Sequence, residues 1–191
     1  MVTEAASHDL QDENGRLKAE VASLRLRVKA LEQLADTDTL TPLPNRRAFM
    51  RRLEAVTEHA VSNNTLAAVL YIDLDGLKRI NDDHGHNIGD AVLIHVANAL
   101  HTHLGVSDMV ARIGGDEFGA ILEQVSETAA RAKAKLLTDQ FSGQVISLEH
   151  AKIAISVTVG VAMVTSNDTP LALVERADAA MYANRLYRSQ I

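Results

Sequence analysis

The sequence predicts an α+β fold with a mainly antiparallel central sheet flanked by helices, preceded by an N-terminal coiled-coil helix. Strand-like and helix-like apolar segments alternate irregularly along most of the chain, and a hairpin signal lies among them, which is typical of α+β folds. A heptad repeat of leucines is confined to the first part of the chain. We therefore divide the 191 residues into a dimerisation helix, residues 1–35, and one further domain, residues 36–191.

The composition excludes several classes of function. Hydrophobic residues make up 47% of the chain and aromatic residues only 3%, so aromatic platforms for stacking single-stranded nucleic acid are not expected. A net charge of −6 argues against general affinity for nucleic acid or an anionic membrane. The chain has no cysteine, which excludes disulfides and thiolate metal sites. Because no signal peptide or membrane-spanning run is present, we expect a cytoplasmic protein that requires no membrane contact.

The heptad repeat of the first segment is typical of a parallel two-stranded coiled coil. Leucines recur at the d positions, and mostly aliphatic residues occupy the a positions. One a position holds an asparagine, which fixes register and strand number at some cost in stability. Residues at successive g and e positions have opposite charges in all three expected pairs. The expected homodimer interface consists of Leu10, Asn14, Leu17, Val21, Leu24, Val28 and Leu31.

Two other interpretations of this segment are less consistent with the sequence. A single amphipathic helix packed on its own domain would need no charge matching between e and g positions, so the matched pairs favour a dimer. A DNA-binding zipper needs a basic region before its first heptad, whereas residues 1–9 are acidic to neutral. The segment is therefore expected to dimerise the chain rather than to bind nucleic acid.

The elements of the second domain follow from local signals. Pro42 and Pro44 end the first helix, and Asn45 is expected to cap a second helix at residues 46–61. The short apolar run at 66–73 predicts a buried strand.

Helical spacing of apolar residues predicts a helix at 88–103, and two short apolar runs predict a hairpin. The hairpin strands are expected at 109–113 and 118–122, joined by a turn at Gly114-Gly115. The remaining expected elements are a helix at 126–141 capped by Ser126, a β-rich segment at 153–164 and a final helix at 170–187.

Two polar clusters follow the expected strands. The first begins at Asp73, where a carboxylate ends a buried strand beside a glycine and a lysine, a natural place for a hard cation and phosphates. The second contains a Gly-Gly turn followed by Asp116 and Glu117. Two carboxylates therefore lie next to a backbone segment that a ligand can approach closely, because glycine has no side chain. If both strands lie centrally in one sheet, these acids would converge on shared metal ions. Magnesium held by carboxylates and substrate phosphates is the usual arrangement in nucleotide chemistry.

Gly114-Gly115-Asp116-Glu117-Phe118 spells the name motif of the GGDEF family of diguanylate cyclases, and the chain resembles that family over about residues 36–187. The resemblance includes the domain start after Asp38, the segment 73–90 and the last helix around 177–182. It implies a palm-like, nucleotide-cyclase fold. It also implies that the domain is catalytic, condensing two GTP into cyclic di-GMP and two pyrophosphate across a homodimer, with magnesium (or manganese) as cofactor.

The same resemblance assigns roles to individual residues. Phosphoryl transfer needs metal and cationic stabilisation rather than a covalent protein nucleophile. An Asn amide and an Asp carboxylate together match the acceptor and donor edges of guanine. The implied catalytic residues are Asp116, also at the place of the proton acceptor for the 3′-hydroxyl, and Glu117; the implied metal ligands are Asp73, the carbonyl of Leu74, Asp116 and Glu117. The implied substrate-binding residues are Asn81, His86 and Asp90 for guanine, with Lys78 and Arg185 for the phosphates.

The chain departs from the family pattern at several places, including two that concern ligand binding. Members subject to product inhibition carry an Arg-x-x-Asp motif before the signature turn, and here Gly105 stands at the arginine position, ahead of Asp108. Loss of a bidentate arginine predicts weak or absent feedback inhibition at that site. Asn184-Arg185 also replaces the usual Ala-Lys of the last helix.

Two alternative functions remain open at this point. A catalytically silent GGDEF-like domain would bind GTP or cyclic di-GMP as a sensor, but such a domain would not need the carboxylates of Asp73, Asp116 and Glu117. A cyclase for another nucleotide is the second alternative. Asp90 favours guanine, because a carboxylate accepts from the N1 and N2 hydrogens of guanine and would repel the acceptor edge of adenine.

Overall fold

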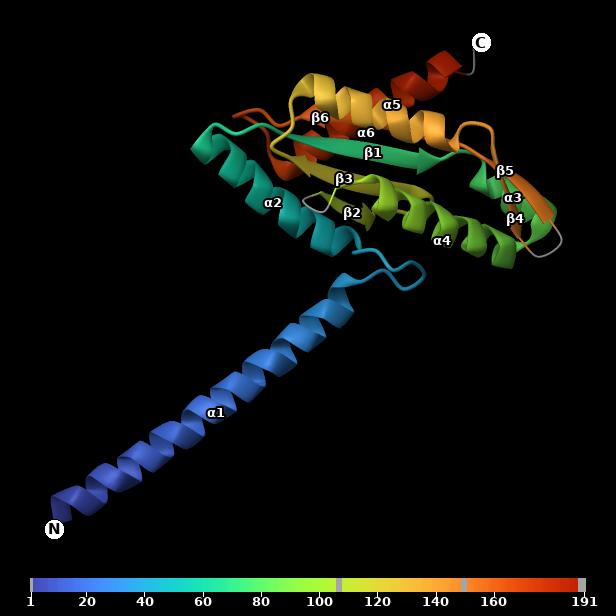
Figure 1. Ribbon diagram of the computed structural model, residues 1–191. Helices are drawn as coiled ribbons and strands as arrows, with labels where there is room; N and C mark the ends of the chain where they lie inside the picture. The colour runs from blue at the N-terminus through green and yellow to red at the C-terminus, as the bar shows by residue number, and fades with distance from the viewer. Residues whose placement is uncertain (1, 106–107, 149–150, 189–191) are drawn as a thin grey trace. The chain divides into compact units, whose positions relative to one another are not determined.

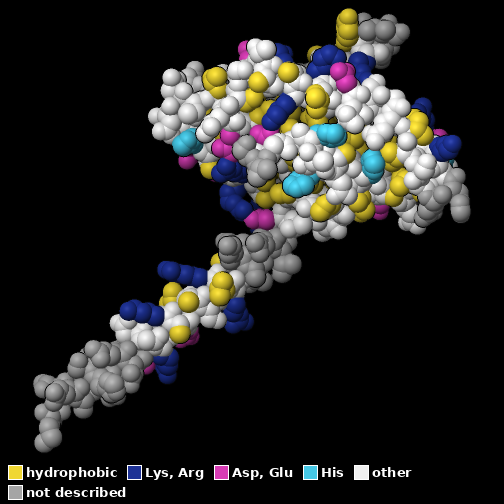
Figure 2. Space-filling model, in the orientation of Figure 1, with side chains coloured by type: hydrophobic (Ala, Val, Ile, Leu, Met, Phe, Trp, Pro, Cys, Tyr) yellow, Lys and Arg dark blue, Asp and Glu magenta, His cyan; other side chains and the backbone are white. Residues whose placement is uncertain are grey.

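The computed structural model describes residues 2–105, 108–148 and 151–188 and divides into two compact units between Asp36 and Thr37. The first unit is a single helix of 35 residues, α1 (Val2–Asp36). Its side chains between residues 13 and 28 are exposed, and hydrophobic ones lie along its surface (Figure 2). The expected interface residues Leu17, Val21, Leu24 and Val28 are 46–52% exposed, whereas the side chains of Leu10 and Leu31 lie outside the described ones.

The second unit is an α+β domain built on a four-stranded sheet of order β2-β3-β1-β6 (Figure 1). All three pairings in this sheet are antiparallel, which confirms the predicted fold class. In chain order the elements are α2 (Arg46–Asn63), β1 (Ala67–Leu74), α3 (Leu77–His84), α4 (His86–His103), β2 (Met109–Arg112), β3 (Glu117–Glu123), α5 (Glu127–Phe141), β4 (Gln144–Leu148), β5 (Ala151–Ile155), β6 (Val157–Met163) and α6 (Pro170–Arg188).

Strand β1 is the centre of the core, and all eight of its residues are buried. Alternate side chains of a strand point to opposite faces of the sheet. Ala68, Leu70 and Ile72 accordingly belong to a hydrophobic cluster with α4 and α5, while Val69 and Tyr71 belong to a second cluster with α2 and α6. The sheet is therefore covered by helices on both faces, and the end of its central strand is held in a fixed position.

The predicted helix caps are present. The Asn45 side chain accepts a hydrogen bond from Ala48 N at 3.1 Å, and the Ser126 hydroxyl accepts one from Ala129 N at 3.2 Å. Such side chains satisfy backbone N–H groups that lack a partner in the first turn of a helix. They set the starts of α2 and α5 where the sequence predicts them.

Two regions differ from the sequence prediction. The polar segment after β1 forms an additional short helix, α3, which gives a weak periodic signal because Ile80 is its only buried residue. The expected β-rich segment at 153–164 is two strands in different sheets: β5 pairs with β4 in a separate hairpin, and β6 joins the main sheet. The break falls at Ser156, whose carbonyl accepts a hydrogen bond from Asp75 N at 3.0 Å.

Helix α6 lies unusually close to β6 because of a glycine. A Cβ atom at Gly160 would stand 2.1 Å from the carbonyl oxygen of Ala177 and 2.2 Å from the backbone nitrogen of Met181. Only a residue without a side chain permits this approach.

Along the part of the chain that the structure describes, no helix is both long and apolar enough to cross a membrane.

Candidate active site

The end of β1 adjoins the Gly114–Phe118 turn, so the two polar clusters of the sequence meet. Asp73 lies opposite Glu117 in the β1–β3 register. The backbone N–H of Leu74 donates to the carbonyl oxygen of Asp116 at 2.9 Å. The structure thus brings together Asp73, Leu74, Asp116 and Glu117, the four residues expected to hold metal.

Asp73 is a buried carboxyl group with only 7% of its surface exposed. Burial raises the pKa of Asp73 to about 6, and the nearby carboxylates of Asp116 and Asp75 favour the same direction. The guanidinium of Arg185 opposes this rise through an ion pair with Asp73. In the ligand-free protein, Asp73 therefore carries a charge that its surroundings only partly stabilise.

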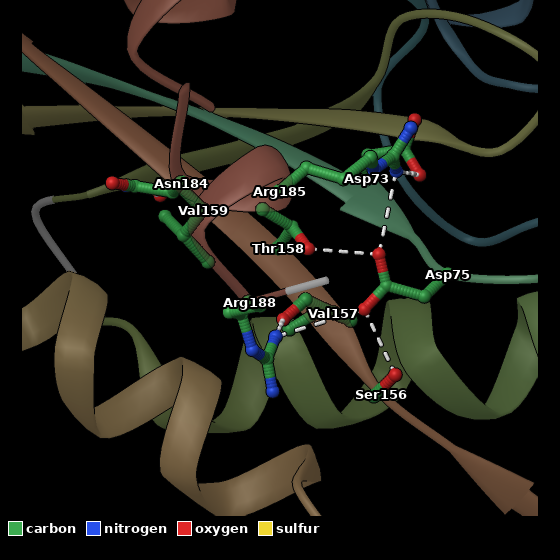
Figure 3. A network of polar contacts seen from close by, with 9 residues as sticks. All are labelled: Asp73, Asp75, Ser156, Val157, Thr158, Val159, Asn184, Arg185 and Arg188. Atoms are coloured by element: carbon green, nitrogen blue, oxygen red, sulfur yellow. Dashed lines mark hydrogen bonds and ion pairs between the residues drawn. The ribbon is translucent and has the colours of Figure 1, made fainter. Parts of the chain in front are cut away.

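Arg185 belongs to a polar network that joins α6 to the end of β1 (Figure 3). Its guanidinium also bonds Asp75 at 3.3 Å. Asp75 in turn accepts hydrogen bonds from the hydroxyls of Ser156 and Thr158, both at 2.8 Å. Arg188 lies 3.7 Å from the other Asp75 carboxylate oxygen.

An open depression of about 390 Å³ lies beside these groups. It is within the range of ligand-sized cavities. Its lining combines hard oxygen donors with two cations, which suits a metal and phosphates. The lining residues are Asp73, Leu74, Asp75, Gly76, Leu77, Lys78, Asp116 and Arg185.

The expected guanine-binding residues lie on the neighbouring helices α3 and α4 and do not line this depression. The Oδ1 atom of Asn81 is buried and has no hydrogen-bond partner. It lies directly over Gly89, where a Cβ atom would stand 1.9 Å from Oδ1. Asp90 and His86 are exposed on α4. Asn81 thus has a buried acceptor atom without a protein partner, which is unusual for a buried polar atom.

Comparison with known proteins decides the family. The family model for the diguanylate cyclase GGDEF domain matches residues 35–189. The chain belongs to the GGDEF family. This confirms the resemblance found in the sequence and places the domain in a family of bacterial cyclic di-GMP signalling proteins.

Individual relatives agree with this assignment. The GGDEF chain is 38% identical over 155 residues to the bifunctional diguanylate cyclase/cyclic di-GMP phosphodiesterase MucR of Pseudomonas aeruginosa, covering 81% of this chain and 22% of MucR. It is 36% identical over 176 residues to the diguanylate cyclase TpbB of the same species, covering 91% of this chain and 39% of TpbB. It therefore spans less than half the length of either relative.

A solved structure with a similar fold is the coiled coil and GGDEF domain of DgcB from Caulobacter crescentus in complex with c-di-GMP. The two structures superpose with a TM-score of 0.80 at 28% sequence identity. The match covers 92% of this chain and 94% of the DgcB chain. The fold of the GGDEF domain is thus shared with a protein that binds cyclic di-GMP.

Glu117 of the GGDEF turn is held by two features that sequence reasoning did not identify. Burial raises the pKa of Tyr71, and a hydrogen bond with Glu117 raises it further. Gly114 provides the necessary space, since a Cβ atom there would stand 1.9 Å from Oε2 of Glu117. The carboxylate of Glu117 is therefore directed back under the turn, toward Tyr71.

Arg112 fixes the other side of the GGDEF turn and was also missed as a functional residue. Its guanidinium donates to the carbonyl oxygen of Gly115 at 2.7 and 3.2 Å, and to Asp38 at 3.2 Å. Burial alone would raise the pKa of Asp38, but hydrogen bonds from Thr41 and Arg112 outweigh it and lower that pKa. A carboxylate, a guanidinium and a backbone carbonyl thus form one connected chain that ends next to Asp116.

Replacing Arg112 with Lys is expected to reduce the cyclase activity that the sequence implies at least about tenfold and to lower the free energy of unfolding by about 1–3 kcal/mol. Lysine keeps the charge but cannot bond Gly115 and Asp38 at the same time, so the turn before Asp116 loses its support. Steady-state kinetics and urea denaturation measure the two effects. Arg131→Lys, in an exposed ion pair with Glu127, is the matched control; equal values for the two variants would contradict the role given to Arg112.

Proposed function

We propose that this protein is a diguanylate cyclase, in which two GGDEF domains each hold one GTP and the 3′-hydroxyl of each GTP attacks the α-phosphate of the other. The products are cyclic di-GMP and two pyrophosphates. The single observation that supports this best is the composition of the depression at the end of β1. Two carboxylates, Asp73 and Asp116, and the backbone of Leu74 lie there beside the cations Lys78 and Arg185.

The donor set fits a magnesium ion, with manganese as the chemically similar substitute. Among residues 2–105, 108–148 and 151–188, no group of three or more His, Asp or Glu side chains is arranged as a complete metal site. Magnesium commonly takes only one or two protein carboxylates and completes its shell with water and substrate phosphates. Asp73, Asp116 and the Leu74 carbonyl, which line the depression, would hold it, and Glu117, opposite Asp73 on β3, would support this metal cluster. When bound, such an ion would stabilise charge on the α-phosphate and lower the pKa of the attacking hydroxyl.

The protein's own groups would do the remaining work. Asp116, besides being a proposed metal ligand, is the proposed acceptor for the 3′-hydroxyl proton. Lys78 and Arg185 would bind the phosphates as charge-assisted donors. The side-chain amide of Asn81 would hydrogen-bond guanine, and Asp90 would accept from its N1 and N2 hydrogens, with His86 beside them. These groups position and stabilise the reactants, which is what phosphoryl transfer requires.

Dimerisation through α1 is the second part of the proposal. One domain holds only half of the reactants, so two domains must face each other for each turnover. A short connection to a dimeric helix would raise their effective concentration to roughly millimolar. The exposed aliphatic stripe of Leu17, Val21, Leu24 and Val28 supports this role. Such a stripe is unfavourable on an isolated helix in water and would be buried between the helices of a dimer.

The purified chain is expected to convert GTP to cyclic di-GMP in the presence of magnesium, and Asp116→Asn is expected to lower the rate by at least about 10²-fold. Asparagine keeps the size of the side chain but supplies neither a strong metal ligand nor a proton acceptor. Chromatography of the nucleotides against a cyclic di-GMP standard measures the product. Absence of product from the wild type, with retained binding of GTP, would instead support the sensor function.

Cyclic di-GMP is expected to leave the initial rate of the enzyme nearly unchanged. Besides the glycine at position 105, the carboxylate of Asp108 is almost fully buried, where it pairs with Lys133 and accepts from the backbone nitrogen of Gly105 at 2.9 Å. An aspartate bonded in this way is not available to a product molecule. Rate measurements at rising cyclic di-GMP concentrations check this, and strong inhibition that disappears in Asp108→Ala would refute it.

A further inference from the structure

We propose that Asp75 is a positioning residue that keeps Arg185, with Arg188 beside it, directed at the phosphates of the bound nucleotide. The inference rests on the proposed function and adds to it a residue that acts through others. Asp75 directly follows β1 and lines the same depression as Asp73. The close view in Figure 3 shows Asp75 at the centre of the network, between the end of β1 and α6.

Asp75 is fixed by short, rigid groups. Its backbone N–H donates to the carbonyl oxygen of Ser156 at 3.0 Å. Its two carboxylate oxygens accept from the hydroxyls of Ser156 and Thr158, each at 2.8 Å. Thr158 lies in β6, which pairs with β1, and Ser156 directly precedes that strand. Because short hydroxyl side chains on a sheet have little freedom, the carboxylate of Asp75 has a defined orientation.

Arg185 shares one guanidinium nitrogen between Asp73 and Asp75. Asp73 is the expected metal ligand, and a carboxylate that binds a metal ion has less charge to offer an arginine. Asp75 has no such second task, because the other side-chain hydrogen bonds that it accepts come from neutral hydroxyls. Asp75 would therefore keep Arg185 beside the depression when Asp73 binds a metal ion. The guanidinium of Arg185 could then turn toward phosphate oxygens.

Arg188 strengthens this arrangement from the next turn of α6. It lies 3.7 Å from Asp75 and donates to the carbonyl oxygen of Val157 at 2.8 Å. Two guanidinium groups thus share the single carboxylate of Asp75, which leaves positive charge uncompensated once Asp73 is engaged. Uncompensated positive charge beside a metal site attracts phosphate. Since hydroxyls and guanidinium groups occupy both oxygens of Asp75, this carboxylate is better suited to orient arginines than to ligate metal.

The first test measures the affinity for 3′-deoxy-GTP, which lacks the attacking hydroxyl and binds without reacting. By calorimetry with magnesium, Asp75→Asn is expected to weaken binding about tenfold, because one charge-assisted bond to Arg185 becomes neutral. In an Arg185→Ala background, the same substitution should change the affinity by less than about twofold. The matched control is Asp139→Asn, an exposed acid paired with Lys135, which should leave the affinity unchanged.

Two results would overturn the inference: an equal loss of affinity in both backgrounds, or no loss in the wild-type background. Failure of the wild type to bind 3′-deoxy-GTP would contradict the proposed function instead. A second test needs no nucleotide or metal and follows the guanidinium nitrogens of Arg185 by NMR. Arg185 should stay ordered in Asp73→Asn and become mobile in the Asp73→Asn, Asp75→Asn double variant. Equal mobility in these two proteins would overturn the inference even if nucleotide binding is normal.

Discussion

Replacing Asp73 with Asn is expected to abolish the proposed condensation of GTP and, above pH 6, to stabilise the ligand-free protein. The loss of activity should be at least about 10²-fold, since removal of a metal ligand costs several kcal/mol of transition-state stabilisation. The gain in stability follows from the burial of Asp73. A group placed for function is here unfavourable for folding, which is common at active sites.

The direction in which stability changes with pH follows from the proton affinities of Asp73 in the folded protein and in the unfolded chain. The pKa of Asp73 is raised from 3.8 to about 6, so between these values the folded protein binds more protons than the unfolded chain. Stability therefore falls as the pH rises through this interval. Above pH 6 the full cost of the buried charge is present, up to about 3 kcal/mol. Asparagine removes that charge.

Urea denaturation in EDTA at pH 8 and pH 5 measures the effect. We expect Asp73→Asn to be more stable than the wild type at pH 8, with a smaller difference at pH 5, where Asp73 is mostly protonated in the folded protein. Asp139→Asn, on the exposed surface of α5, serves as the control. A variant less stable than the wild type at pH 8 would show that the ion pair with Arg185 outweighs the burial of Asp73.

The second large effect is expected from substitutions in α1, which should change the oligomeric state and the activity. Replacing Leu17 and Leu24 together with Asp should make the protein monomeric and lower the specific activity at least about 10²-fold at protein concentrations far below the roughly millimolar effective concentration of the dimer. Two charges at d positions cannot be buried between helices. Activity should recover as the protein concentration is raised, because the catalytic domains themselves are unchanged.

The control for this experiment is Leu26→Asp. Leu26 is 70% exposed and lies outside the a and d positions of the heptad repeat, so the same substitution should leave dimer and activity intact. Sedimentation velocity gives the oligomeric state, and initial rates over a range of protein concentrations give the activity. Unchanged specific activity in a double variant shown to be monomeric would exclude a role of α1 in catalysis.

Local signals predicted the parts of the fold that depend on neighbouring residues. The buried strand before Asp73, the hairpin around Gly114-Gly115 and the caps at Asn45 and Ser126 all follow from apolar runs, glycine pairs and side-chain oxygens. Helix α3 was missed because it buries a single side chain. Strand β4 was missed. Strand β5 was merged with β6 because no turn residue marks the change of sheet at Ser156.

The supporting residues of the site could not be predicted in the same way. Arg112 and Asp38 are 74 positions apart, and Thr158 and Asp75 are 83 apart, so only the folded chain brings them together. Their residue types are common and have no distinctive spacing. By contrast, Asp73 and Asp116 follow strands that each give a clear signal, and their proximity follows from the antiparallel sheet.

The close contact at Gly160 has a consequence for the cations of the site. Since the backbone of α6 meets the backbone of β6 there, even a methyl group at position 160 would force the helix away from the sheet. Arg185 and Arg188 reach Asp75 from the same helix, so they would move with it. Gly160 therefore sets the distance between two arginines and a carboxylate, although it does not line the depression.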